Sequence, residues 1–393
     1  EMTVKLSTNF DSVGLQVRTL VDVFDVLSPR EYPFLKWASG GSDKKPSLNN
    51  LSNKVTSNKY EWGEQPKPLR VTTLSASVTT TDGTTITVPT AAAPLLIVGK
   101  VIKIDDELMV VTTKGSASTG QVGVSRGFGG STASAHDAGA AVRVVSTAHI
   151  EGADSNDDHY QAPTLNYNYI QEITREARLS HIRKALKTYG EKGDPLDMEV
   201  ERKMHEILLD MEGAAWEGLR AEPSSVSPGL MGGFLQYTPA AHVRALGGAS
   251  FQREHMADAL KTVYAATNGA QIPDTVFCNI WGAHKLTEIY GPGVGREQFT
   301  REANDRMGGM VVDTIVTEIG SIAKIIDPNM PADWIVLAKS KTIKFGPVPG
   351  LELGEYELNK TGTADARMIA GVYTSEWHEQ YSRWIFTGIS LTA

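Results

Sequence analysis

The sequence predicts an α+β fold with a small all-β domain inserted into its first half. Three observations lead to this prediction. Residues 194–221 have the pattern of one long amphipathic helix. Residues 71–147 change sharply to short, charge-poor strands that are separated by turns. Residues 250–340 alternate between helix and strand patterns, and strand patterns close the chain.

The helix predicted over residues 194–221 begins with clear local signals. Asp194 can cap the helix, Pro195 suits its first position because the missing N–H has no helical partner there, and Asp197 complements the helix dipole. Apolar residues recur at helical spacing and give one stripe, formed by Val200, Met204, Ile207, Met211, Ala215 and Leu219. We expect this stripe to be buried inside the chain, as part of its core.

The N-terminal part of the chain shows little sign of a core of its own. Residues 17–27 hold apolar side chains at helical spacing, and Phe34, Leu35 and Trp37 then form a compact apolar anchor. Residues 40–59 are rich in Gly, Ser, Asn and Lys. A segment of that composition becomes ordered only by lying on another surface, so we expect a loop or an extended arm here.

Period-two alternation predicts the strands of the inserted domain, and Gly-rich turns separate them. In KVIKIDDELMVV, Ile102 and Ile104 would face one way, and Val101 and Lys103 the other. The order of residues in this domain is similar to a module that recurs in phage structural proteins. That similarity is carried by Gly99, Ile102, Ile104, Asp105, Asp106, Glu107, Met109, Val110, Val124, Arg126, Gly127, His136, Gly139 and Val142 to Val145.

The remaining patterns are less regular. Residues 170–177 fit either a helix or one face of a strand, and we favour a strand to about Ser180 followed by a short helix through Tyr189. Further along, the pattern predicts an amphipathic helix that ends at Gly269 and a buried strand around Cys278.

Composition and charge exclude several classes of function. The net charge of -8 argues against a surface built to grip nucleic acid, which needs clustered Lys and Arg. The single cysteine, Cys278, excludes an intrachain disulfide and a cysteine-based zinc cage, and its apolar neighbours predict a buried side chain. No apolar run approaches the roughly 20 residues that span a membrane. The start, EMTVKLSTNF, has the features of neither a signal peptide nor a transit peptide.

No local motif predicts catalysis, a cofactor or a metal. His and acidic residues gather between His149 and His159, but their spacing matches neither an EF-hand loop nor a zinc motif, so a solvated acidic loop is the better interpretation. The run MHEILLDME lacks the second His of HExxH, and the Gly-rich run near Gly291 lacks the Lys-Ser/Thr of a P-loop. We therefore predict no catalytic, cofactor-binding or metal-binding residues, and no enzyme.

Short motifs follow one another in a characteristic order. They are FDSVGLQ near the start, LSPREYPFL at Leu27–Leu35, YEWGE at Tyr60–Glu64, IEGAD at Ile150–Asp154, NYIQE at Asn168–Glu172, the long helix, and ARMIAGVY in the strand-rich end. Together with the order of arm, loop, helix and α/β unit, they resemble the tailed-phage major capsid proteins of the HK97 fold, in the branch typified by the phage SU10 major head protein. The resemblance covers essentially the whole chain outside residues 71–147.

This resemblance implies a major capsid protein that self-assembles through hexamers and pentamers into an icosahedral shell around double-stranded phage DNA. It implies an N-terminal arm at residues 1–37, an extended loop at 38–70 and 147–165, the inserted β-rich domain at 71–146, a peripheral domain at 166–237 and 341–393 with a spine helix at 195–220, and an axial domain at 238–340. We expect the inserted domain on the outer surface of the shell, where packing is sparse.

The resemblance also implies where the protein assembles and which partners it has. Assembly would take place in the host cytoplasm, without membrane contact. The partners would be other copies of the chain, a portal, and decoration or scaffolding proteins, with packaged DNA nearby but no sequence-specific DNA binding. An acidic net charge suits a wall that should not adhere to DNA. The candidate contacts between subunits are Trp62, Glu64, Arg70, Arg296, Phe299, Arg301 and Arg306.

The residues alone leave two other classes of function open. One is a surface-binding or decoration protein whose β domain recognises a sugar or a protein. The other is a hydrolase built on the α/β segment of residues 250–340.

Overall fold

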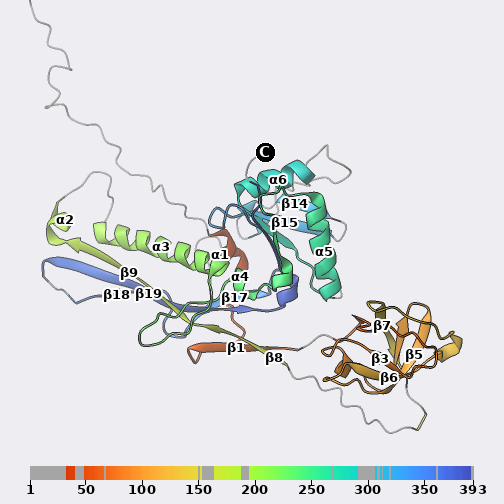
Figure 1. The fold of residues 1–393 in the computed structure, drawn as a ribbon. Helices are drawn as coiled ribbons and strands as arrows, with labels where there is room; N and C mark the ends of the chain where they lie inside the picture. Colours follow the sequence, from red (N-terminus) through yellow and green to blue (C-terminus); the bar gives the residue numbers. More distant parts are fainter. Residues whose placement is uncertain are drawn as a thin grey trace, which may run out of the picture. The chain divides into compact units, whose positions relative to one another are not determined.

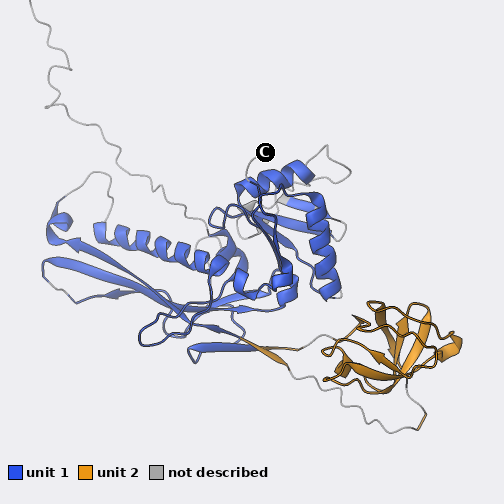
Figure 2. Ribbon diagram, viewed as in Figure 1, with its two compact units in different colours: residues 1–62, 167–393 blue, residues 63–166 orange. Residues whose placement is uncertain are grey.

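The computed structural model describes most of the chain, namely residues 32–39, 48–65, 68–148, 151–152, 163–186, 194–267, 269–290, 306–307, 310–311, 313–317, 320–359 and 362–390. The chain divides into a large unit, residues 1–62 and 167–393, and a small unit, residues 63–166 (Figure 2). The expected helix at residues 17–27 and most of the acidic cluster before His159 lie outside the described residues.

The long helix of the large unit, α3 (Pro195–Glu217), lies along a four-stranded antiparallel sheet (Figure 1). The central strand is β19 (Ala364–Trp377), which pairs with β9 (Gln171–Ser180) along one side. Its other side pairs with β18 (Gly354–Glu357) and β17 (Ile343–Pro347). One long strand therefore ties the C-terminal part of the chain to the segment that precedes α3.

Local sequence sets the start of α3, whereas packing sets its end. The Asp194 carboxylate accepts a hydrogen bond from the Leu196 backbone N–H at 3.0 Å, which confirms the predicted cap. The helix ends at Glu217, earlier than predicted. Gly218 leaves helical geometry there, and a Cβ atom on it would lie 2.5 Å from the carbonyl oxygen of Met231. The chain turns where a glycine lets two backbone segments approach closely.

Most of the predicted apolar stripe of α3 is buried. Val200, Ile207, Met211 and Ala215 belong to the core of the large unit. The prediction is wrong for Met204, which is half-buried, and for Leu219, which lies beyond the end of the helix and is 58% exposed. The buried face is wider than the predicted stripe, because it also includes Leu196, Leu208, Glu212 and Trp216.

The second sheet of the large unit has six strands in the order β10-β20-β16-β11-β15-β14. These strands are β10 (Val243–Ala245), β20 (Trp384–Thr387), β16 (Ile335–Ala338), β11 (Thr275–Cys278), β15 (Gly320–Ile326) and β14 (Asp313–Thr317). Two helices, α5 (Arg253–Thr267) and α6 (Ile280–Tyr290), pack on the face of Val276 and Cys278. Phe277, on the opposite face, joins the core around α3. The strand β11 thus separates two cores.

The strand β20 corrects part of the predicted domain division. We expected residues 341–393 to return together to the sheet of α3, and β17, β18 and β19 do so. β20 instead lies between β10 and β16 in the second sheet. Its side chains explain the difference, because Trp384 and Phe386 belong to the core beneath α5, where Phe386 packs edge-on against Phe251 at 5.0 Å.

Short helices and strands complete the large unit. The predicted strand ending at Ser180 is confirmed, and it is followed by the short helix α2 (His181–Ala185). The other short helices are α1 (Pro33–Ala38) and α4 (Phe234–Tyr237), and a ribbon is formed by β1 (Lys59–Glu64) with β8 (Thr164–Tyr169). Residues 306–311 contribute the two-residue strands β12 (Arg306–Met307) and β13 (Met310–Val311).

The small unit contains a six-stranded sheet in the order β2-β7-β4-β5-β6-β3. Its strands are β2 (Val71–Thr73), β3 (Thr85–Thr87), β4 (Lys100–Ile104), β5 (Glu107–Thr113), β6 (Gln121–Ser125) and β7 (Ala141–Thr147). Ser75 N donates to Thr87 O at 2.8 Å, which links the two edges of the sheet. Ile102, Ile104, Met109 and Val124 belong to a core that this unit forms by itself. The sequence-based prediction of short strands with period-two burial is confirmed here.

Deleting residues 71–146 is expected to leave the large unit folded. None of the described residues in that range belongs to the cores of the large unit. The cut ends also lie together, because Val144 N donates to Arg70 O at 2.9 Å. A short Gly-Ser join should therefore preserve the circular dichroism of the large unit and its thermal unfolding within about 3 °C. Loss of all soluble folded protein would contradict this expectation.

Candidate functional site

The residues predicted to make contacts between subunits fall in different parts of the chain, and the structure does not describe all of them. Arg296, Phe299 and Arg301 lie outside the described residues, and Arg306 begins the strand β12. In the small unit, Arg70 is exposed.

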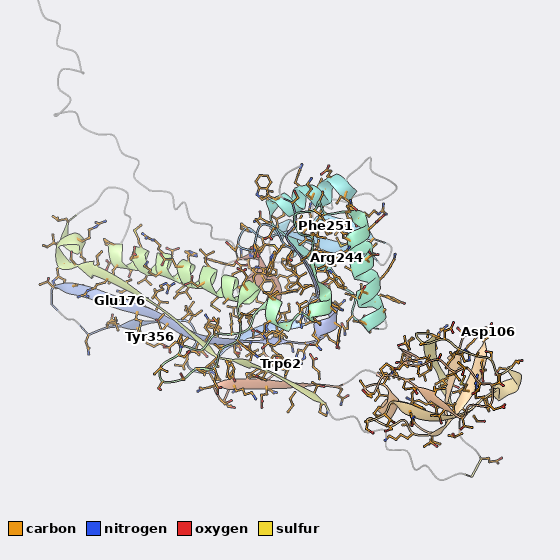
Figure 3. All side chains as sticks on the ribbon, viewed as in Figure 1. Trp62, Asp106, Glu176, Arg244, Phe251 and Tyr356 are labelled. Atoms are coloured by element: carbon orange, nitrogen blue, oxygen red, sulfur yellow. The ribbon has the colours of Figure 1, made fainter. Side chains whose placement is uncertain are left out.

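Trp62, which is labelled in Figure 3, is a poor candidate for a contact between subunits, because the residue is only 6% exposed within the chain. Its ring packs against Tyr237 at 5.7 Å and against Tyr60 at 6.3 Å. It therefore offers little surface to a neighbour and holds β1 on the body of the large unit. Glu64, two residues further along β1, is half-buried.

Tyr167, on β8, anchors the β1–β8 ribbon where the ribbon joins the large unit. The Lys59 ammonium lies 4.2 Å and the Arg220 guanidinium 4.0 Å from the centre of the Tyr167 ring. The backbone carbonyl of Tyr167 accepts hydrogen bonds from Tyr237 Oη at 2.7 Å and from Arg220 Nη1 at 3.2 Å. Cation–π contacts and side-chain hydrogen bonds together fix the position at which the chain leaves the large unit.

Phe34 is the centre of the large unit's core. It is fully buried, and its ring lies between 4.3 and 6.4 Å, centre to centre, from six aromatic rings. Those rings belong to Trp37, Trp216, Phe234, Phe277, Phe345 and Trp377, which come from α1, α3, α4, β11, β17 and β19. The predicted apolar anchor is therefore the point at which both sheets and the long helix meet. Trp37 Nε1 adds a hydrogen bond to Thr275 Oγ1 at 3.1 Å.

Two carboxyl groups lie next to this aromatic cluster, Glu212 on α3 and Asp327 after β15. Both side chains are fully buried. Glu212 Oε1 accepts a hydrogen bond from Phe34 N at 2.8 Å, and Asp327 Oδ2 accepts one from Trp216 Nε1 at 2.9 Å. Burial, and after it the charge of Asp327, raise the pKa of Glu212 to about 9. Burial also raises the pKa of Asp327.

The small unit holds a second buried polar network, around Glu107. Arg126 binds this carboxylate through Nε at 3.0 Å and Nη2 at 2.6 Å. Glu107 also accepts backbone hydrogen bonds from Gly127 and Ser134, and it contacts His136 Nε2 at 3.0 Å. Burial works against ionisation, but these hydrogen bonds, led by that of Arg126, lower the pKa of Glu107 to about 2. The motif residues Glu107, Arg126 and His136 therefore fix the loop after β6 to β5.

The described residues hold neither a group of metal ligands nor a reactive thiol. Among them, no cluster of His, Cys, Asp and Glu could hold a metal ion. Burial raises the pKa of the Cys278 thiol to about 12, so the thiol is not a nucleophile at neutral pH. No helix in the described ranges combines the length and the apolar character required to cross a bilayer.

Comparison with known families decides the identity of the chain. A family model described as SU10 major capsid protein matches residues 2–390. The chain belongs to the SU10 major capsid protein family. It is thus a major capsid protein, a structural protein of an icosahedral bacteriophage shell and not an enzyme, and copies of it associate into a lattice. The family assignment also excludes the hydrolase alternative.

Solved structures similar to this capsid protein share little sequence with it. A chain of Mycobacterium phage Bobi has 10% identity and a TM-score of 0.46, with 98% of this chain and 99% of that chain covered. The SrpI encapsulin of Synechococcus elongatus has 9% identity and a TM-score of 0.45, with 60% and 79% covered. The satellite phage P4 procapsid has 14% identity and a TM-score of 0.42, with 62% and 79% covered. None of the curated proteins matches the sequence.

Sequence reasoning missed several residues that organise this capsid protein. Tyr167 carried no motif, and its role depends on Lys59 and Arg220, which are distant in the sequence. Glu212 did carry a signal, because it is a charged residue next to Met211 on the buried face of α3. A carboxyl group at such a position must be paired, bonded or protonated, and this reasoning could have identified it.

Proposed function

We propose that this capsid protein assembles through hexamers and pentamers, with the large unit forming the wall of the shell. The supporting observation is that the described residues next to the proposed arm and the proposed loop are anchored on the large unit. Residues 1–31 precede the aromatic cluster of Phe34, and the β1–β8 ribbon is held at Tyr167. A chain built this way can extend its arm and loop over neighbouring copies while its own core stays fixed.

The parts of the chain receive roles in this proposal. Residues 1–37 act as the arm, and residues 38–70 and 147–165 as the extended loop. The peripheral part comprises residues 166–237 with the α3 sheet, and the axial part comprises residues 238–340 together with β20, which belongs to the same sheet. The inserted β-rich domain, residues 71–146, faces the outside of the shell. Repeated contacts of modest size then sum over many symmetric copies.

We further propose the contacts and partners of the shell. Arg296, Phe299, Arg301 and Arg306 contact the neighbouring subunit around the capsomer axis. Glu64 and Arg70 contact neighbours from the extended loop, whereas Trp62 positions that loop. The other partners are a portal and decoration or scaffolding proteins, and assembly takes place in the host cytoplasm. Packaged DNA lies nearby without sequence-specific contact, as the net charge of -8 favours.

Charge reversal around the proposed axis tests the proposal. The triple variant Arg296→Glu, Arg301→Glu, Arg306→Glu should fold, but we expect it to give at least about tenfold fewer shells, because the reversal replaces each proposed arginine contact with the neighbouring subunit by a charge of the wrong sign. Sedimentation and negative-stain microscopy measure the yield, and circular dichroism measures folding.

A matched triple variant controls for the change in net charge. Lys114→Glu, Arg143→Glu and Lys261→Glu alter exposed residues outside the proposed contacts and should leave assembly unchanged. Equal shell yields from the two triple variants would refute the axial contact. Only small species from the wild-type chain, under every assembly condition tested, would refute the capsomer proposal.

A further inference from the structure

The Glu212–Asp327 pair joins segments that are far apart in the sequence. Glu212 Oε1 accepts a hydrogen bond from Phe34 N at 2.8 Å, and Glu212 Oε2 accepts one from Asn329 Nδ2 at 2.7 Å. Asp327 Oδ1 accepts a hydrogen bond from Asn329 N at 2.8 Å, and Asp327 Oδ2 accepts one from Trp216 Nε1 at 2.9 Å. The pair therefore connects α1, the C-terminal half of α3 and the loop that follows β15.

The groups that face the pair donate hydrogen bonds but bring little positive charge. α1 supplies the Phe34 and Leu35 backbone N–H groups, α3 supplies Trp216, and the loop after β15 supplies Asn329 and the Met330 backbone N–H. These donors are neutral, so they stabilise one carboxylate in the site better than two.

No cationic side chain is among the main groups that shift the pKa values of this pair in the described part of the chain. Lys324 on β15 is nearly buried, and its ammonium lies 3.4 Å from Thr287 Oγ1. Cys278 on β11 is protonated at neutral pH because burial raises its pKa to about 12. His205 lies two turns before Glu212 on α3, and its Nδ1 forms a hydrogen bond with Tyr32 Oη at 2.6 Å. Two adjacent carboxylates in this site would repel each other across a medium of low polarity.

We propose that the Glu212–Asp327 pair is a proton-operated joint between the two sheets of the large unit, closed while the pair holds a proton and strained open when both carboxyl groups are ionised. Opening would move α3, with α1 bound to it, away from the loop after β15. Because Phe34 N is hydrogen-bonded to Glu212, opening of the joint would also loosen α1.

The direction of the pH effect follows from the pKa of Glu212, which burial raises from 4.5 to about 9. A carboxyl group with a raised folded-state pKa contributes stability that is complete below its unfolded pKa and is lost as the pH rises through the folded pKa. The joint is therefore tightest in mild acid and weakens toward pH 9. This dependence is opposite to that of an ordinary ion-paired carboxylate.

Glu212→Gln in the full chain tests the joint. Glutamine keeps an oxygen for Phe34 N and cannot ionise, and its amide replaces the oxygen that accepts from Asn329 Nδ2. We expect the Tm of the wild-type protein to fall by at least about 4 °C more than that of the variant between pH 6 and pH 9. Amide exchange of the peptides that contain Phe34 and Asn329, corrected for intrinsic rates, should rise at least about tenfold in the wild type over that range, and should stay flat in the variant.

Two further variants complete the experiment. Glu206→Gln lies on the same helix but at the surface, where Glu206 pairs with Lys203, so it should keep the wild-type pH profile. Asp327→Asn removes the other carboxyl group and should flatten the profile as Glu212→Gln does, which gives a second test if the first variant folds poorly. Wild-type pH profiles in the folded pair variants, or failure of both to fold at every pH, would overturn the proposal.

Discussion

Phe34→Ala is expected to lower the free energy of unfolding of the large unit by about 4 kcal/mol, the upper part of the range for large core side chains. The cavity would open where six aromatic rings now contact the same side chain, and these rings sit on both sheets, α1, α3 and α4. Such a site cannot collapse without moving all of these elements together. Chemical denaturation of the full-length protein, followed by the fluorescence of the buried tryptophans, measures the loss.

The same substitution at an exposed phenylalanine provides the control. Phe128 is 44% exposed in the small unit, so Phe128→Ala should change stability by less than about 0.5 kcal/mol. We expect Phe34→Ala also to reduce the yield of shells, because less folded subunit is present at 37 °C. A loss below about 1 kcal/mol for Phe34→Ala would show that the aromatic cluster does not hold the large unit together.

Arg126→Met is expected to destabilise the small unit by about 3 kcal/mol, because it leaves the buried Glu107 carboxylate without its cationic partner. His136 and two backbone N–H groups would remain near Glu107, but they do not supply the paired guanidinium contact. Hydrogen exchange of residues 68–148 in the full-length protein measures the change. Exchange in the large unit should not respond.

Acid should reduce the difference between Arg126→Met and the wild type. The folded-state pKa of Glu107 is lowered from 4.5 to about 2, so its contribution is present above pH 4.5 and is lost as the pH falls toward 2. The control, Arg143→Met, changes an exposed arginine of the same unit and should have little effect. If both variants were equally stable at pH 7, the buried network would not be what holds the loop to β5.

The parts of the fold that could be predicted from sequence are those that local chemistry determines. The start of α3 follows from the Asp194 cap, and the strands of the small unit follow from alternation and turns. The end of α3 depends on the backbone around Met231, and the position of β20 depends on its pairing with β10 and β16. Such contacts join residues that are distant in the sequence, and periodicity carries no information about them.

In the candidate site too, local residue patterns predict some features, whereas contacts between distant residues determine the others. The apolar anchor at Phe34 could be recognised as a cluster, but not as the centre of the core, because its ring partners span residues 37 to 377. Trp62 lies in a polar, extended segment of the sequence, which gives no sign of burial. Its burial comes from Tyr237, which no local pattern connects to it.

The adjacent ends of the small unit have a consequence for the history of the gene. Arg70 and Val144 are joined by one backbone hydrogen bond, so the chain leaves this unit beside the point at which it enters. Recombination could therefore add or remove its coding segment in a single event, without altering the spacing of the flanking ribbon. Related phages would then be free to vary this segment, or to lack it, while they retain the same large unit.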